Sequence, residues 1–122
     1  MTFISVAAAM YNGTFQKRNR KKYCLQILKL PPAAAQEGNF RQAVRYLYLY
    51  SLDLLHRKGM VVMMADKTNA DYLRELRGNP YYKTFSLLTL AYEYVWFGHM
   101  NLGKEQFDEL NGRFVAFKNE LK

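Results

Sequence analysis

Two side chains capable of acid–base chemistry, Asp53 and His56, lie three positions apart in a segment with helical periodicity. Residues three apart on a helix are neighbours, so this carboxylate and imidazole are close enough to interact. A catalytic dyad also needs a nucleophile, and nothing in the sequence identifies Ser51 or Ser86 as one. We therefore predict a surface pair, or a histidine that contacts a tyrosine, and we expect the chain not to be an enzyme.

The sequence offers little to a metal ion or a cofactor. The single cysteine, Cys24, excludes an internal disulfide and a multi-cysteine zinc site, and the chain has only two histidines, His56 and His99. Lysines beside Cys24 could lower the pKa of its thiol, and a cysteine beside a membrane is a palmitoylation candidate. A lone cysteine in a tail is more often incidental. We predict no catalytic residue, no metal and no cofactor.

A second group of residues suits binding rather than catalysis. Arg41 and Arg45 lie one helical turn apart, and their guanidinium groups suit a carboxylate or phosphate on a partner. The alternative is a solvated face, or an ion pair with Glu93 or Asp71. Trp96 and Tyr92 are most simply core residues, but either one anchors a binding surface if it is exposed beside Arg45. The candidate partner surface consists of Arg41, Arg45, Tyr92, Glu93 and Trp96.

Positive charge is concentrated at the start of the chain. The 122 residues carry 18 basic and 10 acidic side chains, for a formal net charge of +8. Six of the basic residues and none of the acidic ones lie in residues 1–30, so residues 31–122 are nearly balanced. Clustered basic residues beside a membrane gain about 1 kcal/mol each from anionic headgroups. The candidate membrane-surface contacts are Lys17, Arg18, Arg20, Lys21 and Lys22.

The basic run follows an apolar stretch, residues 2–15, in the order seen at the cytoplasmic end of a membrane segment. This stretch is too short to span a membrane alone, and a signal peptide has its positive charge first. The head is therefore a solvated tail or a juxtamembrane segment whose spanning helix lies upstream. A basic arm also suits nucleic-acid phosphates, but most of the ten tyrosines lie in helical patterns away from it, so nucleic acid is disfavoured.

Prolines and glycines divide the rest of the chain into helices. Pro31-Pro32 marks a boundary between a head, residues 1–30, and a helical domain, residues 31–122. Half of the residues are hydrophobic and 16% are aromatic, which is ample for a core. Glycines at 38, 59, 78 and 98 end successive helical patterns. We expect helices over residues 33–37, 40–58, 70–77, 79–97 and 104–121.

These helices predict an all-α, compact bundle of about five helices, two of them short, with one short extended segment near residues 60–64. The helix over residues 40–58 is apolar nearly all round, which is typical of a central helix. In the last helix, Phe107, Leu110, Phe114 and Phe117 recur at spacings of three and four, which predicts one buried face. The expected helix caps are Asn39, Thr68 or Asn69, and Asn79.

Three strings in the helical domain carry a family resemblance: GNFRQAVR at 38–45, KTNADYL at 67–73 and YEYVWFG at 92–98. In this order they resemble the uncharacterised C-terminal domain of bacterial transglutaminase-like membrane proteins, which also occurs on other bacterial membrane proteins. The resemblance covers about residues 33–121. Phe97 departs from it where tyrosine is common, and Gly103 departs where a serine-type cap is expected. The resemblance implies a domain on the cytoplasmic face of the bacterial inner membrane, with no known activity.

We therefore expect a non-catalytic interaction or scaffolding domain of a membrane-associated bacterial protein. Its expected partners are an unidentified protein and, through the head, an anionic membrane surface; no small-molecule substrate is evident. One alternative is a soluble peptide-binding adaptor, because residues 40–44 after Gly38 also look like a tetratricopeptide-type hairpin. A concave groove lined by Arg41 and Arg45 would favour that adaptor. The other alternative is nucleic-acid contact through the basic arm.

Overall fold

The computed structural model describes residues 35–36, 38–98 and 101–121. Among these residues are four helices of eight residues or more and no strand, so the all-α class is confirmed, while the expected number of about five helices was slightly too high. The helices are α3 (Phe40–Arg57), α4 (Asn69–Leu76), α5 (Tyr82–Phe97) and α6 (Lys104–Leu121). Of the short helix expected over residues 33–37, only Ala35 and Gln36 are described, and both are helical. The head, including its candidate membrane contacts, lies outside the described residues.

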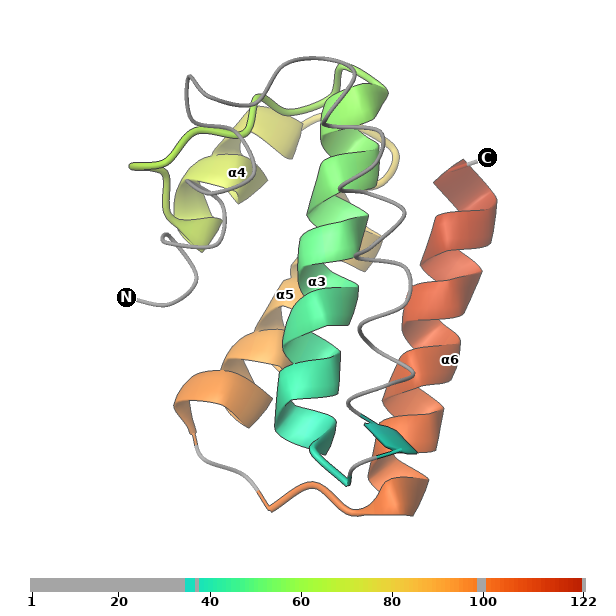
Figure 1. The fold of residues 1–122 in the computed structure, drawn as a ribbon. Coiled ribbons are helices and arrows are strands. Elements are labelled where there is room, and N and C mark those ends of the chain that lie inside the picture. The colour runs from blue at the N-terminus through green and yellow to red at the C-terminus, as the bar shows by residue number, and fades with distance from the viewer. Residues whose placement is uncertain (1–34, 37, 99–100, 122) are drawn as a thin grey trace, which may run out of the picture.

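Helix α3 is the central helix, as its all-round apolar sequence predicted. It contacts both α5 and α6, while α4 packs against α5. Figure 1 shows α6 beside α3 and running in the same direction, whereas α5 crosses behind α3 in the opposite direction. The predicted apolar stripe of α6 is buried along its whole length. None of the described helices is both long enough and apolar enough to cross a membrane.

Local signals fix both ends of α3. The side chain of Asn39 accepts a hydrogen bond from the backbone N–H of Gln42 at 3.2 Å, which satisfies a donor that the first turn leaves unpaired. After the helix, Gly59 has a φ of 75°, a conformation that side chains with a Cβ rarely adopt. Its N–H donates to His56 O, and the N–H of Met60 donates to Leu55 O. This pair of bonds is a Schellman motif, and it ends α3 one residue earlier than expected.

The sequence predicted the cap of α4 but not the start of α5. The Thr68 hydroxyl accepts from the N–H of Asp71, and the Asp71 carboxylate accepts from the N–H of Thr68, so Thr68 caps α4. For α5 the expected cap was wrong. Asn79 accepts a hydrogen bond from the N–H of Tyr81 at 2.9 Å within a turn, and the helix begins only at Tyr82. The Asn79-Pro80 pair therefore builds the turn before α5 and not its first residues.

Aromatic rings from three helices stack into one column through the core. Tyr48 of α3 stacks on Tyr92 of α5 with ring centroids 4.4 Å apart, and on Phe85 at 5.3 Å. Phe85 in turn stacks on Phe117 of α6 at 5.7 Å. The Tyr48 hydroxyl shares a hydrogen bond of 3.1 Å with Thr89, so its polar end is satisfied inside the core. These tyrosines build the interior, where they are unavailable for stacking on nucleic-acid bases.

Candidate functional site

The structure brings the five candidate partner-surface residues together where the start of α3 meets the end of α5. Arg41 donates two hydrogen bonds, from Nε at 3.2 Å and Nη2 at 2.5 Å, to the backbone carbonyl of Trp96. Trp96 is the penultimate residue of α5, and the last carbonyls of a helix lack partners within it. A cation at this end also complements the helix dipole. Arg41 therefore stabilises the C-terminus of α5.

Both arginines also lie over the indole ring of Trp96. The guanidinium carbons of Arg41 and Arg45 are 4.0 and 4.7 Å from the ring centroid, which is cation–π geometry. Arg45 is only 4% exposed and Trp96 only 9%. Burial lowers the pKa of Arg45 from its usual value, because an interior site disfavours the charged form. The indole thus receives two guanidinium groups inside the fold.

Tyr92 and Glu93 connect this cluster to the core and to α4. Tyr92 is fully buried, and burial raises the pKa of its hydroxyl to about 12. The Glu93 carboxylate accepts a hydrogen bond from the side chain of Asn69 at 3.2 Å. Asn69, expected as an alternative helix cap, therefore joins α4 to α5. The five residues form an internal cluster, in which Arg41 and Glu93 are half-buried, and not an open surface.

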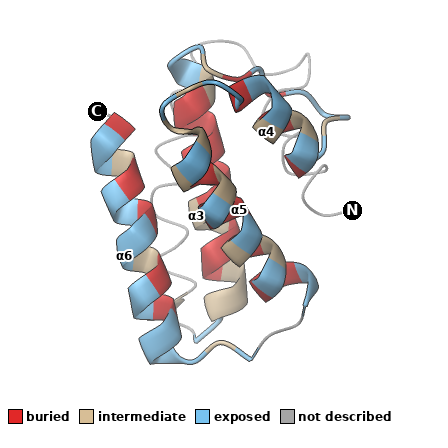
Figure 2. Ribbon diagram, turned by 180° about the vertical axis from the view of Figure 1, so that it is seen from behind, coloured by how far each residue is buried: buried red, intermediate tan, exposed pale blue. Residues whose placement is uncertain are grey.

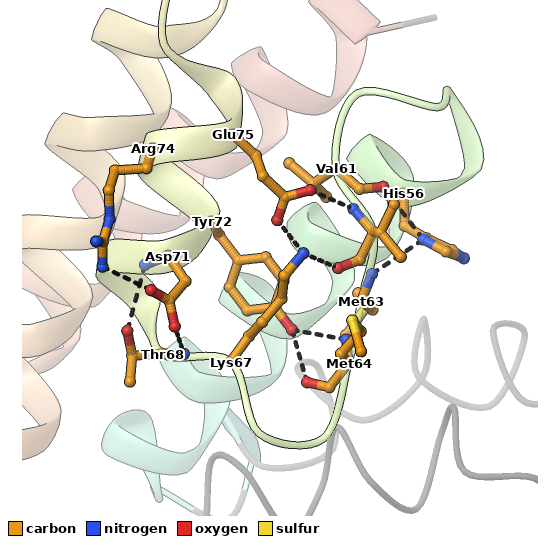
Figure 3. Close-up of polar contacts among 11 residues, drawn as sticks. His56, Val61, Met63, Met64, Lys67, Thr68, Asp71, Tyr72, Arg74 and Glu75 are labelled. Atoms are coloured by element: carbon orange, nitrogen blue, oxygen red, sulfur yellow. Dashed lines mark hydrogen bonds and ion pairs between the residues drawn. The ribbon is translucent and has the colours of Figure 1, made fainter.

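Side chains of the string at residues 67–73 hold the loop before α4 in place (Figure 3). The Tyr72 hydroxyl donates to the carbonyl of Met64 at 3.1 Å and accepts from the N–H of the same residue at 3.2 Å. Lys67 forms an ion pair with Glu75 and donates to the carbonyl of Val62 at 2.6 Å. Glu75 accepts from the N–H of Val62 at 3.1 Å. Together these contacts hold the loop against α4 through the side chains of Tyr72 and Glu75.

Side-chain contacts of the same kind hold residues 60–64, a segment that has no regular secondary structure. Its side chains alternate between buried and exposed, as in a strand, but it has no strand partner among the described residues. The N–H of Met63 donates to His56 Nδ1 at 3.2 Å, and His56 Nδ1 also lies 3.3 Å from the carbonyl oxygen of Val61 (Figure 3). Side chains of α3 and α4 therefore take the place of a neighbouring strand.

Residues considered for catalysis also have structural contacts. The buried Asp53 carboxylate lies 3.0 Å from Arg57 Nε. Ser51 donates its hydroxyl to the carbonyl of Leu47 at 3.0 Å, and Ser86 donates to Lys83 at 2.8 Å, both within their own helices. In the part of the chain that the structure describes, no three histidine, cysteine, aspartate or glutamate side chains are placed to hold a metal ion.

Sequence reasoning missed a groove between α5 and α6. On the outer side of α5, Leu87, Leu90 and Tyr94 are 49%, 57% and 63% exposed. Together with α6 they line a groove of about 430 Å³, and a smaller hollow of about 230 Å³ adjoins it at Leu87. In Figure 2, α5 lies in front of α3, and the side facing the viewer is mainly exposed or half-buried. The groove wall on α6 includes Glu109, Leu110 and Arg113.

The missed signal is a second apolar stripe on α5. The inner stripe, which includes Phe85, Leu88 and Tyr92, is buried as the periodicity predicts. Leu87, Leu90, Ala91 and Tyr94 form another stripe at spacings of three, four and seven. Helix α5 contacts α3, α4 and α6, yet Leu87, Leu90 and Tyr94 of the second stripe remain about half exposed or more, so this stripe is largely uncovered by the described chain. Neither the groove nor the adjoining hollow is lined by Arg41 or Arg45.

Comparisons with known protein families, curated proteins and solved structures find no match to this chain.

Proposed function

We propose that this chain is a non-catalytic, helical protein-interaction domain that contacts its partner through the outer face of α5. The outer face is defined as Leu87, Leu90, Ala91, Tyr94 and Phe97. One observation carries the proposal: the large apolar side chains of this face are exposed, and Leu87, Leu90, Ala91 and Tyr94 line a groove of about 430 Å³. Soluble proteins rarely expose a contiguous apolar patch without a binding role.

The internal arginine–tryptophan cluster supports this choice of surface. The guanidinium groups of Arg41 and Arg45 already contact the Trp96 ring, and Arg41 also donates to the Trp96 carbonyl. A carboxylate or phosphate of a partner would have to displace these contacts. Binding at the outer face of α5 displaces no contacts of this kind, because its large side chains are exposed to solvent. Burying apolar area contributes about 25 cal/mol per Å², which is a sufficient driving force for association.

Photo-crosslinking within cells tests the proposal. A photoreactive amino acid at Leu90 in the full-length chain should give covalent adducts with protein, because this position lies in the middle of the outer face. The matched control is the same substitution at Val115, an exposed apolar residue of α6 that does not line the groove. We expect adducts from position 90 and few from position 115. No adduct from position 90, or equal yields from both positions, would contradict the proposal.

The sequence resemblance and the basic head extend the proposal to placement at the cytoplasmic face of a bacterial inner membrane. The test is co-sedimentation with anionic phosphatidylglycerol vesicles and with neutral phosphatidylcholine vesicles. Replacing the five basic residues at positions 17, 18, 20, 21 and 22 by glutamine should weaken binding to anionic vesicles at least about tenfold, since each charge contributes about 1 kcal/mol. Unchanged binding would show that the head does not contact the membrane.

A further inference from the structure

The groove between α5 and α6 and the smaller hollow beside it together have the length of a helix. Leu87 and Arg113 line both of them, so the two adjoin at these residues. Their α6 wall runs from Gln106 to Glu120, which is about 21 Å at a rise of about 1.5 Å per residue. A helix of about four turns has this length. The described residues include no strand whose edge an extended peptide could join, so a helix is the occupant that these two helical walls suit.

Arg113 is an exposed cation at the junction of these two hollows, which apolar side chains mainly line. Glu109 precedes it by one turn of α6, a spacing at which acidic and basic side chains often pair. On the same helix Lys104 and Asp108 do pair at this spacing, at 3.1 Å. In contrast, no ion pair or hydrogen bond joins Arg113 to another described residue. Its guanidinium donors are therefore available to a carboxylate of a partner.

Acidic residues lie on both sides of Arg113 along the groove. Glu109 lines the larger hollow and Glu120 lines the smaller one. The α6 wall thus presents negative, positive and negative charge in that order, at spacings of four and seven residues. A complementary partner places basic, acidic and basic side chains in the same order, beside apolar side chains that cover Leu87 and Leu90.

Resting on the proposed interaction function, we infer that the partner segment is an amphipathic helix of another protein, with an acidic residue at the centre of its binding face and basic residues on either side. The central carboxylate pairs with Arg113, and the basic side chains pair with Glu109 and Glu120. Apolar side chains of the same helix bury the exposed Leu87 and Leu90. The apolar contacts supply affinity, and the order of charges fixes the register and direction of the bound helix.

Other occupants of the groove lack this order of charges. A second copy docked through the outer face of α5 offers Arg113 no carboxylate, because the acidic residue of α5 is Glu93, which is half-buried and bound to Asn69. Residues 1–30 of this chain contain no acidic residue either. The phosphates of an anionic membrane would suit Arg113 but would be repelled by Glu109 and Glu120.

Selection from a displayed library of helical peptides, with the full-length chain as target, tests the inference. Each peptide has about four turns, leucines along one face and randomised residues beside them. Peptides that still bind the Leu90→Glu variant are discarded, so that those retained bind in the groove. We expect aspartate or glutamate to be enriched at the central position, whereas an Arg113→Glu target should enrich lysine or arginine there. Lys118→Glu makes the same change of charge on α6 outside the groove, and it should leave the acidic preference unchanged.

Fluorescence anisotropy with one selected peptide gives the quantitative measurement. Arg113→Glu should raise the Kd at least about tenfold, because the central carboxylate of the peptide then meets a like charge. Replacing that acidic residue of the peptide by lysine should recover most of the loss.

Three results would overturn the inferred partner: no peptide whose binding depends on Leu90, retained peptides without an acidic preference, or equal affinity for Arg113→Glu. Photo-adducts of position 90 formed only between two copies of this chain would overturn it as well. If any of the three occurred while position 90 still crosslinked to another protein in cells, the interaction function would stand without this partner. Absence of every adduct at position 90 would instead contradict the interaction function itself.

Discussion

The Asp53 carboxyl illustrates how a single residue couples the fold to pH. It is buried in α3, and loss of hydration raises its pKa to about 6, although the nearby Arg57 guanidinium acts in the opposite direction. Its usual pKa is 3.8, so between about pH 4 and 6 the folded state binds this proton more readily than the unfolded state. The contribution of Asp53 to stability therefore increases as the pH falls through 6, and is lost as the pH rises.

An Asp53→Asn variant should lack this pH response. Lowering the pH from 7 to 4.5 should raise the free energy of unfolding of the natural chain relative to the variant, by at most about 3 kcal/mol. Urea denaturation of both proteins at the two pH values measures this difference. The comparison cancels other groups such as Asp71, whose pKa is lowered by hydrogen bonds from Thr68 and which acts in the opposite sense. An identical pH response in both proteins would contradict the assignment.

For single residues, the sequence predicted that Arg41, Arg45 and Trp96 lie together, but it did not predict whether their side chains are exposed or buried. Helical spacing places Arg41 and Arg45 on one side of α3, and it marks Trp96 as apolar surface near the end of α5. Exposure depends on how α3 and α5 cross, and on Asn69 of α4 reaching Glu93. These contacts join residues 24 to 55 positions apart, which no local pattern encodes.

The bounds of a helix were predicted accurately where the residues at its ends, or its apolar stripe, gave a clear signal. The bounds of α6 agree with the prediction at both ends, because its apolar residues follow one stripe without interruption. The bounds of α3 agree to one residue, since Asn39 and Gly59 are unambiguous end signals. The start of α5 was wrong because Asn79-Pro80 is favourable both as a helix start and as a turn, and the Asn79 side chain stabilises the turn.

Two further elements show where local patterns stop being informative. Residues 60–64 have the alternation of a strand, but their backbone is bound by His56, Tyr72 and other side chains that only the folded chain brings near. Helix α5 carries two apolar stripes of similar strength, and periodicity alone does not say which one is buried. Packing decides the matter: the stripe with Phe85 and Tyr92 stacks on Tyr48 of the central helix. The stripe with Leu90 is left outside.

For the whole molecule, the consequence is an asymmetric bundle. Helix α3 packs against α5 and α6, and α5 also contacts α4 and α6, but the outer side of α5 stays largely exposed. The buried cluster around Trp96 holds the end of α5 in place through Arg41. The packed core thus presents the outer face of α5 beside the groove between α5 and α6, and we propose that the protein acts through this surface.

Hydroxyl-radical footprinting of the full-length chain in dilute solution tests this account most directly, because it compares two tyrosines on opposite sides of α5. Tyr94 should be oxidised readily, as an exposed ring, while Tyr92 should be protected by its stacking on Tyr48. Protection of Tyr94 in the dilute chain, or equal labelling of both tyrosines, would contradict the account.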